Sequence, residues 1–159
     1  MPVIKHKNQR VSVFIDVQNL YHSAKHLYKA RVNFKEVVKT AVAGRSLVRA
    51  IAYVISTESG EEKGFFDALT KLGIETKQKE LQVFFGGAKK ADWDVGIAVD
   101  AVVLCSGDGD FTPLVEQLQS MGKQVEVITF GKSASARLKE AADDFIDLCD
   151  EPEKYLLKK

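Results

Sequence analysis

The chain has 159 residues, 45% of them hydrophobic, and 23 basic residues stand against 22 acidic ones for a formal net charge of +1. This length and composition predict one domain with a full core. The balanced charge excludes a protein that coats a polyanion, so any nucleic-acid binding must be confined to a local surface.

Apolar runs that end at turn residues alternate along the chain with segments of helical period. This alternation predicts βαβ units and a mainly parallel sheet, hence an α/β fold. The predicted strands are residues 11–16, 47–55, part of 74–85, 101–106 and 124–129, with a short last strand at 145–148. Apolar faces at helical spacing lie at residues 20–28, 34–41 and 65–72, and two further helices are expected after residues 110 and 131.

The domain is expected to span residues 11–148. Residues 1–10 form a polar N-terminal tail, and residues 149–159 form a C-terminal tail that we expect to fray or to dock on a partner. No run approaches the roughly 18 apolar residues of a membrane span, so we expect a cytoplasmic protein with no membrane partner. Cys105 and Cys149 lack CxxC spacing and sit in apolar runs, which predicts small core residues in a reducing compartment.

Two of the predicted strands end in acidic residues. The first closes on Asp16, and the fourth is followed by the turn 106–110, which carries Asp108 and Asp110. Ligands of open α/β sheets bind outside the carboxyl ends of the strands, so these carboxylates should gather there. Two charges about 4 Å apart repel by roughly 4 kcal/mol at an effective dielectric of about 20, so the cluster needs a cation, a shared proton or generous solvation. Oxygen ligands suit Mg²⁺ or Mn²⁺, and the pattern therefore predicts a metal site.

Each of these aspartates also has a structural interpretation. Asp16 alone could cap the helix that follows it, and Asp110 has the position of an N-cap before the helix that carries Pro113 in its first turn. Asp108 could be an ordinary turn residue. Three acids at the ends of two strands nevertheless favour a functional site.

A further acid comes from the segment 89–100. A helix that begins near Asp92 would hold Asp94 in its first turn, where the helix dipole favours a carboxylate that points toward the strand ends. Asp100 lies about 240° further round such a helix, so Asp94 and Asp100 cannot face one metal ion. We therefore favour Asp94 as a ligand, keep Asp92 as a candidate cap, and assign Asp100 a supporting or structural role.

Other known motifs fit poorly. Counted from Asp108, an EF-hand would need glycine at position six and glutamate at position twelve, where this chain has proline and glutamine. The segment 131–133 (GKS) is similar to the end of a P-loop, but the glycine required five residues earlier is Glu126. His22 and His26 have the spacing of two zinc ligands without an evident third. All histidines precede residue 30, so nucleophilic catalysis by a side chain is not expected.

Three separated motifs, at residues 14–20 (FIDVQNL), 90–101 (KADWDVGIAVDA) and 106–111 (SGDGDF), resemble the NYN domain of the LabA/DUF88 type in order and spacing. This family is a branch of the PIN-like nuclease superfamily. The resemblance covers roughly residues 10–148. It implies a Rossmann-like three-layer α/β sandwich and a ribonuclease that hydrolyses RNA phosphodiester bonds with Mg²⁺ or Mn²⁺.

The resemblance also assigns roles to single residues. Carried over position by position, the catalytic and metal-binding acids would be Asp16, Asp94, Asp108 and Asp110. Asn19 and Ser106 would orient ligands or substrate. In the mechanism that this implies, metal ions held by the acids would activate water for hydrolysis. The lysines near the site would contact flanking phosphates, and these are Lys89, Lys90 and Lys132. Trp93 could stack on a base, whereas Phe111 is expected in the core.

Two other classes of function stay open on the sequence. A catalytically inactive domain could bind RNA, a nucleotide or a protein through the same acidic edge in a regulatory role. Aspartates at strand ends also serve metal-dependent phosphatases and receiver-like phosphoacceptors, for which Lys132 would be a loosely placed partner. RNA is the expected ligand, and the apolar residues 155–157 allow a homodimer or a protein partner.

Overall fold

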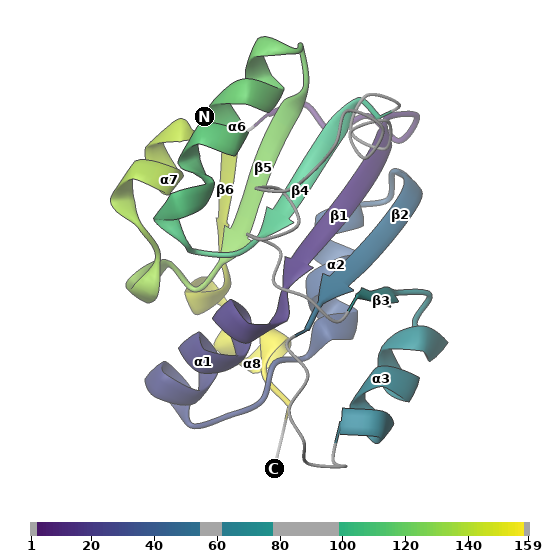
Figure 1. Cartoon of the computed structure of the whole chain (residues 1–159), viewed down its shortest axis with the longest axis vertical. Helices are drawn as coiled ribbons and strands as arrows, with labels where there is room; N and C mark the ends of the chain where they lie inside the picture. Colours follow the sequence, from purple (N-terminus) through teal and green to yellow (C-terminus); the bar gives the residue numbers. More distant parts are fainter. Residues whose placement is uncertain (1–2, 55–61, 78–98, 158–159) are drawn as a thin grey trace.

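The structure is a computed structural model that describes residues 3–54, 62–77 and 99–157 (Figure 1). In this part of the chain, six parallel strands form one sheet in the order β3-β2-β1-β4-β5-β6. The strands are β1 (Arg10–Asp16), β2 (Ser46–Tyr53), β3 (Glu75–Lys77), β4 (Ala101–Cys105), β5 (Gln124–Thr129) and β6 (Asp144–Asp147). The helices are α1 (Val17–Tyr28), α2 (Phe34–Val42), α3 (Glu62–Lys71), α6 (Thr112–Ser120), α7 (Ala136–Ala141) and α8 (Pro152–Tyr155). Short 3₁₀ turns are η2 (Gly109–Phe111), η3 (Gly131–Ser133) and η4 (Leu148–Asp150).

The strand order reverses between β1 and β4. The chain moves outward from β1 to β3, and β4 then pairs with the other side of β1, in the register Val13 with Val103 and Ile15 with Cys105. In doubly wound sheets of this order, ligands bind in the crevice at the carboxyl ends of the two strands that flank the reversal. A ligand site is therefore expected at the carboxyl ends of β1 and β4.

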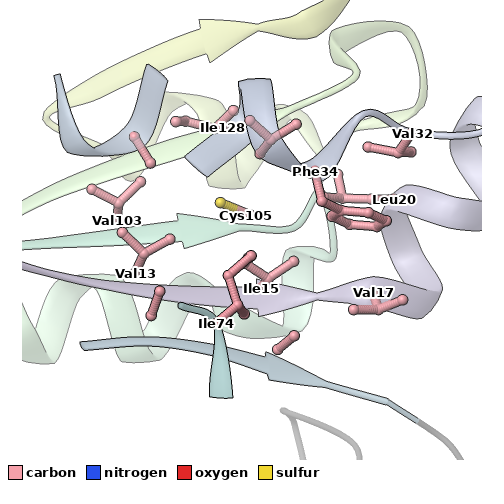
Figure 2. Packing of buried hydrophobic residues seen from close by; sticks show 14 of the residues in the cluster. Val13, Ile15, Val17, Leu20, Val32, Phe34, Ile74, Val103, Cys105 and Ile128 are labelled. Carbon is pink, nitrogen blue, oxygen red and sulfur yellow. The ribbon is translucent and has the colours of Figure 1, made fainter. Parts of the chain in front are cut away.

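Helices cover both faces of the sheet, which gives the three layers predicted for an α/β sandwich. One face packs against α1, α2, α3 and α8, and Figure 2 shows Val13, Ile15 and Cys105 of this face beside Leu20 of α1 and Phe34 of α2. The other face packs against α6 and α7. Both faces of β4 are covered, so all five of its residues are buried and its sequence is a continuous apolar run. Each fully buried aliphatic side chain contributes roughly 1.5–3 kcal/mol to folding.

The cysteines have the positions predicted for core residues. Cys105 is buried in β4, and burial raises the pKa of its thiol. Cys149 packs half-buried against the same core, and both thiols are free. None of the helices in the described ranges is both long and apolar enough to cross a membrane.

Within the described residues, the predicted strands and helices are confirmed within a few residues, with two local corrections; the helix expected to begin near Asp92 lies outside them. Leu72, predicted on a helical face, lies in the turn after α3 and is 41% exposed. Asp110 is not the helix cap. The chain enters α6 through the 3₁₀ turn η2, so that the capping carboxylate is Asp108, which accepts a hydrogen bond from the amide of Asp110 at 2.9 Å. The extra turn moves the cap two residues toward the N-terminus.

The C-terminal segment after β6 does not fray within the described residues. Tyr155 of α8 is only 3% exposed, and its hydroxyl lies 2.8 Å from that of Thr40 on α2. The amide of Leu157 donates to the carbonyl of Arg31 at 2.8 Å. This segment therefore closes the core on the side of α2, because a buried tyrosine with a satisfied hydroxyl anchors it.

Candidate active site

Asp16 has the capping role that its sequence position allows, and its carboxylate also contacts the turn after β4. As the last residue of β1, it has an extended backbone and caps α1, and its Oδ1 accepts a hydrogen bond from the amide of Asn19 at 3.2 Å. Its Oδ2 accepts a second hydrogen bond from the hydroxyl of Ser106 at 3.0 Å. The carboxylate is half-buried. The cap uses Oδ1 alone, so Oδ2 is able to contact the turn after β4.

The turn after β4 is tied to the start of α1 by side chains from both elements. The Ser106 hydroxyl donates to Asp16 and accepts from the amide of Asp108 at 3.2 Å. The Oδ1 of Asn19 accepts from the amide of Gly107 at 2.9 Å. Two segments that are about 90 positions apart in the sequence, residues 16–19 and 106–108, therefore form one hydrogen-bonded unit at the strand reversal.

The two acids of the turn have different settings. Asp108 is half-buried, and the hydrogen bond from the amide of Asp110 to its Oδ1 fixes its orientation. Asp110 lies exposed at the rim. The hydroxyl of Thr112 donates to the carbonyl of Gly109 at 2.7 Å and thereby holds the turn against the first residue of α6. These hydrogen bonds hold Asp108 in a fixed orientation, whereas Asp110 is exposed to solvent.

Gly107 brings the turn after β4 against the loop that follows β5. Its carbonyl accepts from the amide of Ser135 at 3.0 Å. A Cβ at residue 107 would lie 3.1 Å from Cα of Ala134, closer than side chains normally approach backbone. The loop after β5 is anchored in turn to β6, because Oδ1 of Asp147 accepts from the amide of Gly131 at 2.7 Å. A side chain at 107 would require the loop at Ala134 to move by a few tenths of an ångström, so this close approach favours glycine.

A row of polar residues crosses the carboxyl edge of the sheet. Tyr53, Asp16, Ser106 and Thr129 each come two positions after a residue of the α6-side core, and the strand registers align them. Side chains alternate along a strand, so all four share one face. The sequence analysis did not place Tyr53 and Thr129 in this row. Each is the last residue of its strand, and the alternation of side chains along the strand could have indicated its place at the edge. The Thr129 hydroxyl is buried without a hydrogen-bond partner among the described residues.

The donor chemistry of this edge fits a hard divalent cation. The atoms offered by Asp16, Asp108 and Asp110 are all oxygens, and the hydrogen bonds described above come from neutral amides and a hydroxyl, which orient the carboxylates without neutralising them. Within the described ranges, no three His, Cys, Asp or Glu side chains are grouped closely enough to hold a metal ion. The three aspartates therefore do not complete a site by themselves. Asp94, the fourth predicted ligand, lies outside the described residues.

Among the described residues, the structure does not show at this edge of the sheet any lysine that was predicted to contact phosphates. Lys89 and Lys90 lie outside the described residues, as do Asp92 and Trp93. Lys132 is exposed in η3, with its Nζ 5.9 Å from the ring centroid of Tyr28. Tyr28 is the last residue of α1, about 18 Å from Asp16 along the helix axis. The structure thus places Lys132 beside α1 and not among the carboxylates.

Other side chains singled out in the sequence lie away from the carboxyl edge. Asp100 precedes β4 at the opposite end of the sheet, where hydrogen bonds from the amide and guanidinium of Arg10 lower its pKa. This is the structural role predicted for it. Phe111 is buried in the core, as expected. His22 and His26 are exposed on α1.

Comparison with known proteins points to a single family. The model of the NYN domain matches residues 10–149. Low amplitude and bright protein LabA of Synechococcus elongatus is 26% identical over 165 residues, which cover 89% of this chain and 84% of LabA. A crystal structure of a protein of unknown function from Vibrio parahaemolyticus superposes with a TM-score of 0.78 at 30% identity, over 98% of this chain and 100% of the other. The matched region includes Asp16, Asn19 and the whole turn after β4.

Proposed function

Because this chain belongs to the NYN domain family, a branch of the PIN-like nucleases, we propose that it hydrolyses RNA phosphodiester bonds with Mg²⁺ or Mn²⁺. The observation that carries the proposal is the hydrogen-bonded unit of Asp16, Ser106 and Asp108 at the strand reversal. It brings oriented carboxylates from two strands to the edge where ligands of such sheets bind. The other proposed ligands are Asp110 at the rim and Asp94.

The chemistry divides between the ion and the protein. A divalent ion held by these carboxylates would lower the pKa of a bound water and stabilise charge on the phosphoryl oxygens. The chain supplies the positions of its ligands. Ser106 holds one oxygen of Asp16 in place, and the amide of Asp110 holds one oxygen of Asp108. Ligands that are oriented by such neighbours bind metal more tightly than free carboxylates do.

Asn19 would contact the substrate through its amide nitrogen. Its Oδ1 accepts from the amide of Gly107, which can only donate, so this hydrogen bond assigns the oxygen and leaves Nδ2 as a donor. Asn19 is half-buried beside Asp16, so Nδ2 would donate to a phosphate oxygen held at the same edge. Lys89 and Lys90 would contact the flanking phosphates, where their charge would offset that of the RNA backbone.

The decisive variant is Asp108→Asn. Asparagine keeps an oxygen that can accept from the amide of Asp110, so we expect the fold to be retained while metal-dependent cleavage of a labelled RNA is lost. The matched control is Asp67→Asn, which removes a carboxylate from the exposed face of α3. Full cleavage by Asp108→Asn, abolished by EDTA, would overturn the assignment of Asp108.

Metal binding can be tested without RNA through thermal unfolding. An ion at 100 times its dissociation constant stabilises a protein by about 2.7 kcal/mol. We expect this shift with Mg²⁺ or Mn²⁺ in the parent protein and its loss in Asp16→Asn, since asparagine caps a helix as well as aspartate does and keeps the stability comparison fair. A protein that binds RNA but neither binds metal nor cleaves would be a binding module instead.

A further inference from the structure

The solvent face of α1 differs from those of the other helices. Residues 17–29 contain no Asp or Glu, whereas every other α-helix of the described ranges contains at least one acid. The exposed side chains of residues 17–29 include two lysines, two histidines and a tyrosine. In a chain with almost equal numbers of acidic and basic residues, this helix concentrates positive charge on one surface.

The cationic and aromatic residues are arranged in order along the helix. Tyr21 and Lys25 are four residues apart on the same side of α1, and Nζ of Lys25 lies 5.7 Å from the ring centroid of Tyr21. Lys29 follows as the left-handed C-cap of the helix. Lys132 adds a further charge at the C-terminal end of α1, beside Tyr28. We call this the α1 surface and define it by Tyr21, His22, Lys25, His26, Lys29 and Lys132.

The position of η3 against α1 is fixed by packing. The hydroxyl of Ser133 donates to that of Ser23 at 2.9 Å, and the rings of Tyr28 and Phe130 lie 5.9 Å apart. Contact with the Cys149 thiol raises the pKa of Tyr28 to about 12, so its hydroxyl stays neutral. Lys132 therefore lies beside a neutral ring, and the nearby Asp147 carboxylate also contributes to the raised pKa of Tyr28.

The α1 surface is continuous with the acidic edge. The N-cap of α1 is Asp16 itself, and Figure 1 shows α1 at the end of the sheet to which the β1 arrow points. From Asp16 to Lys29 the helix rises about 20 Å, which corresponds to about six nucleotides stacked at ~3.4 Å each. A nucleic-acid strand that leaves the carboxylates can therefore follow the helix over its whole length.

We propose that single-stranded RNA docks along the α1 surface. The phosphates contact Lys25, Lys29 and Lys132, and a base stacks on Tyr21 in place of the lysine that now covers the ring. Tyr21 is 44% exposed and is the only aromatic side chain among the large exposed hydrophobic residues of the described ranges. A membrane-binding helix would present several apolar residues here, and the α1 surface presents one ring among cations. The choice of RNA as the ligand rests on the proposed function, whereas the docking surface itself is inferred from the exposed lysines and Tyr21 of the α1 surface.

The test measures RNA binding separately from cleavage. Fluorescence anisotropy of a labelled 12-nucleotide oligouridylate is followed in EDTA, so that no metal-dependent cleavage occurs. The triple variant Lys25→Gln, Lys29→Gln and Lys132→Gln is compared with a triple variant of equal charge on other helices, Lys35→Gln, Lys39→Gln and Lys71→Gln. All six side chains are exposed, so both variants should fold.

We expect the α1 triple variant to bind at least tenfold more weakly than the parent, and the control triple to stay within about twofold. The slope of log Kd against log salt should fall by about 2 in the α1 triple, since each contact to a single strand contributes ~0.7. Tyr21→Leu should weaken binding about tenfold, whereas Tyr21→Phe, which keeps the ring, should bind like the parent.

Several results would overturn the inference. One is an equal loss of RNA affinity in the two triple variants, and another is a parent protein that does not bind the oligonucleotide. A third is a parent protein that binds vesicles with one-quarter phosphatidylglycerol, if the α1 triple variant loses this binding and the control triple keeps it. Cleavage and RNA binding, both measured on the parent protein, separate this inference from the proposed nuclease. RNA bound through α1 by a parent that never cleaves would refute the nuclease alone. If the parent protein cleaves RNA and the α1 triple variant binds RNA as tightly as the parent does, the docking surface alone is refuted.

Discussion

The hydroxyl of Ser106 lies 3.0 Å from Oδ2 of Asp16, and this contact joins the ends of β1 and β4. The hydroxyl oxygen of Ser106 also accepts a hydrogen bond from the amide of Asp108 at 3.2 Å, so this one hydroxyl connects two of the proposed metal ligands. Ser106 itself is buried. Its function is therefore expected to be indirect, because it orients the Asp16 carboxylate and holds the backbone of Asp108.

Ser106→Ala should impair cleavage more than it impairs folding. Loss of the hydroxyl removes a donor to Asp16 and an acceptor for Asp108, which should lower metal affinity or activity by about 10- to 100-fold and the free energy of unfolding by about 1–2 kcal/mol. The matched control is Ser12→Ala, because the Ser12 hydroxyl is buried on the same sheet face without a hydrogen-bond partner among the described residues. Its removal should cost less than about 0.5 kcal/mol. Equal effects of the two variants on cleavage and on urea unfolding would contradict the role of Ser106.

Asn19 should hold the turn after β4 in place. In Asn19→Ala, the amide of Gly107 loses its acceptor, so its hydrogen exchange should accelerate, and cleavage should fall together with it. Asn19→Asp keeps an acceptor oxygen and should retain slow exchange at Gly107, while replacing the amide donor with a charge that repels phosphate. Hydrogen exchange followed by NMR measures the first effect, and RNA cleavage measures the second. Unchanged exchange at Gly107 in Asn19→Ala would count against this role.

The buried ion pair of Arg45 and Glu126 should dominate the stability of the opposite end of the sheet. Both nitrogens of the guanidinium fork lie 2.8 Å from the two carboxylate oxygens, and both side chains are fully buried. Removal of one partner leaves a buried charge, so Arg45→Met should cost about 3–5 kcal/mol in urea unfolding. Arg45→Met combined with Glu126→Leu should recover much of that loss. A double variant as unstable as the single one would show that the pair itself stabilises the fold.

Acid should loosen β3 before the centre of the sheet. The guanidinium of Arg49, hydrogen-bonded to Glu75 at 2.7 Å, lowers the pKa of Glu75 below its ordinary value of 4.5. The stabilisation from this partly exposed pair is therefore present above pH 4.5 and is lost as the pH falls through the lowered pKa. Protection of the Lys77 amide against hydrogen exchange should decrease in that range, while that of Val103 should not. In Glu75→Gln this pH dependence should disappear; its persistence would point to another group.

Local patterns in the sequence were sufficient to predict the strands and the position of Asp16 and Asp108 at strand ends. Alternation of apolar residues and the turn residues that stop each run are properties of neighbouring positions, so they do not depend on which strands pair. The same holds for Cys105, whose apolar surroundings already indicated burial. The cap of α6 could not be located in this way, because a 3₁₀ turn before the helix follows from tertiary contacts of the turn after β4 and not from helical period.

The sequence by itself thus determined an α/β fold with acids at the ends of two strands, since side-chain alternation and chain breaks are encoded residue by residue. Only the tertiary structure decided that β4 pairs with β1, which brings Ser106 to Asp16 across about 90 positions. It also decided that Lys132 lies beside α1 and away from the carboxylates. Strand order and loop placement depend on how whole helices bury their apolar faces against the sheet, and that long-range packing leaves no signal at any single position.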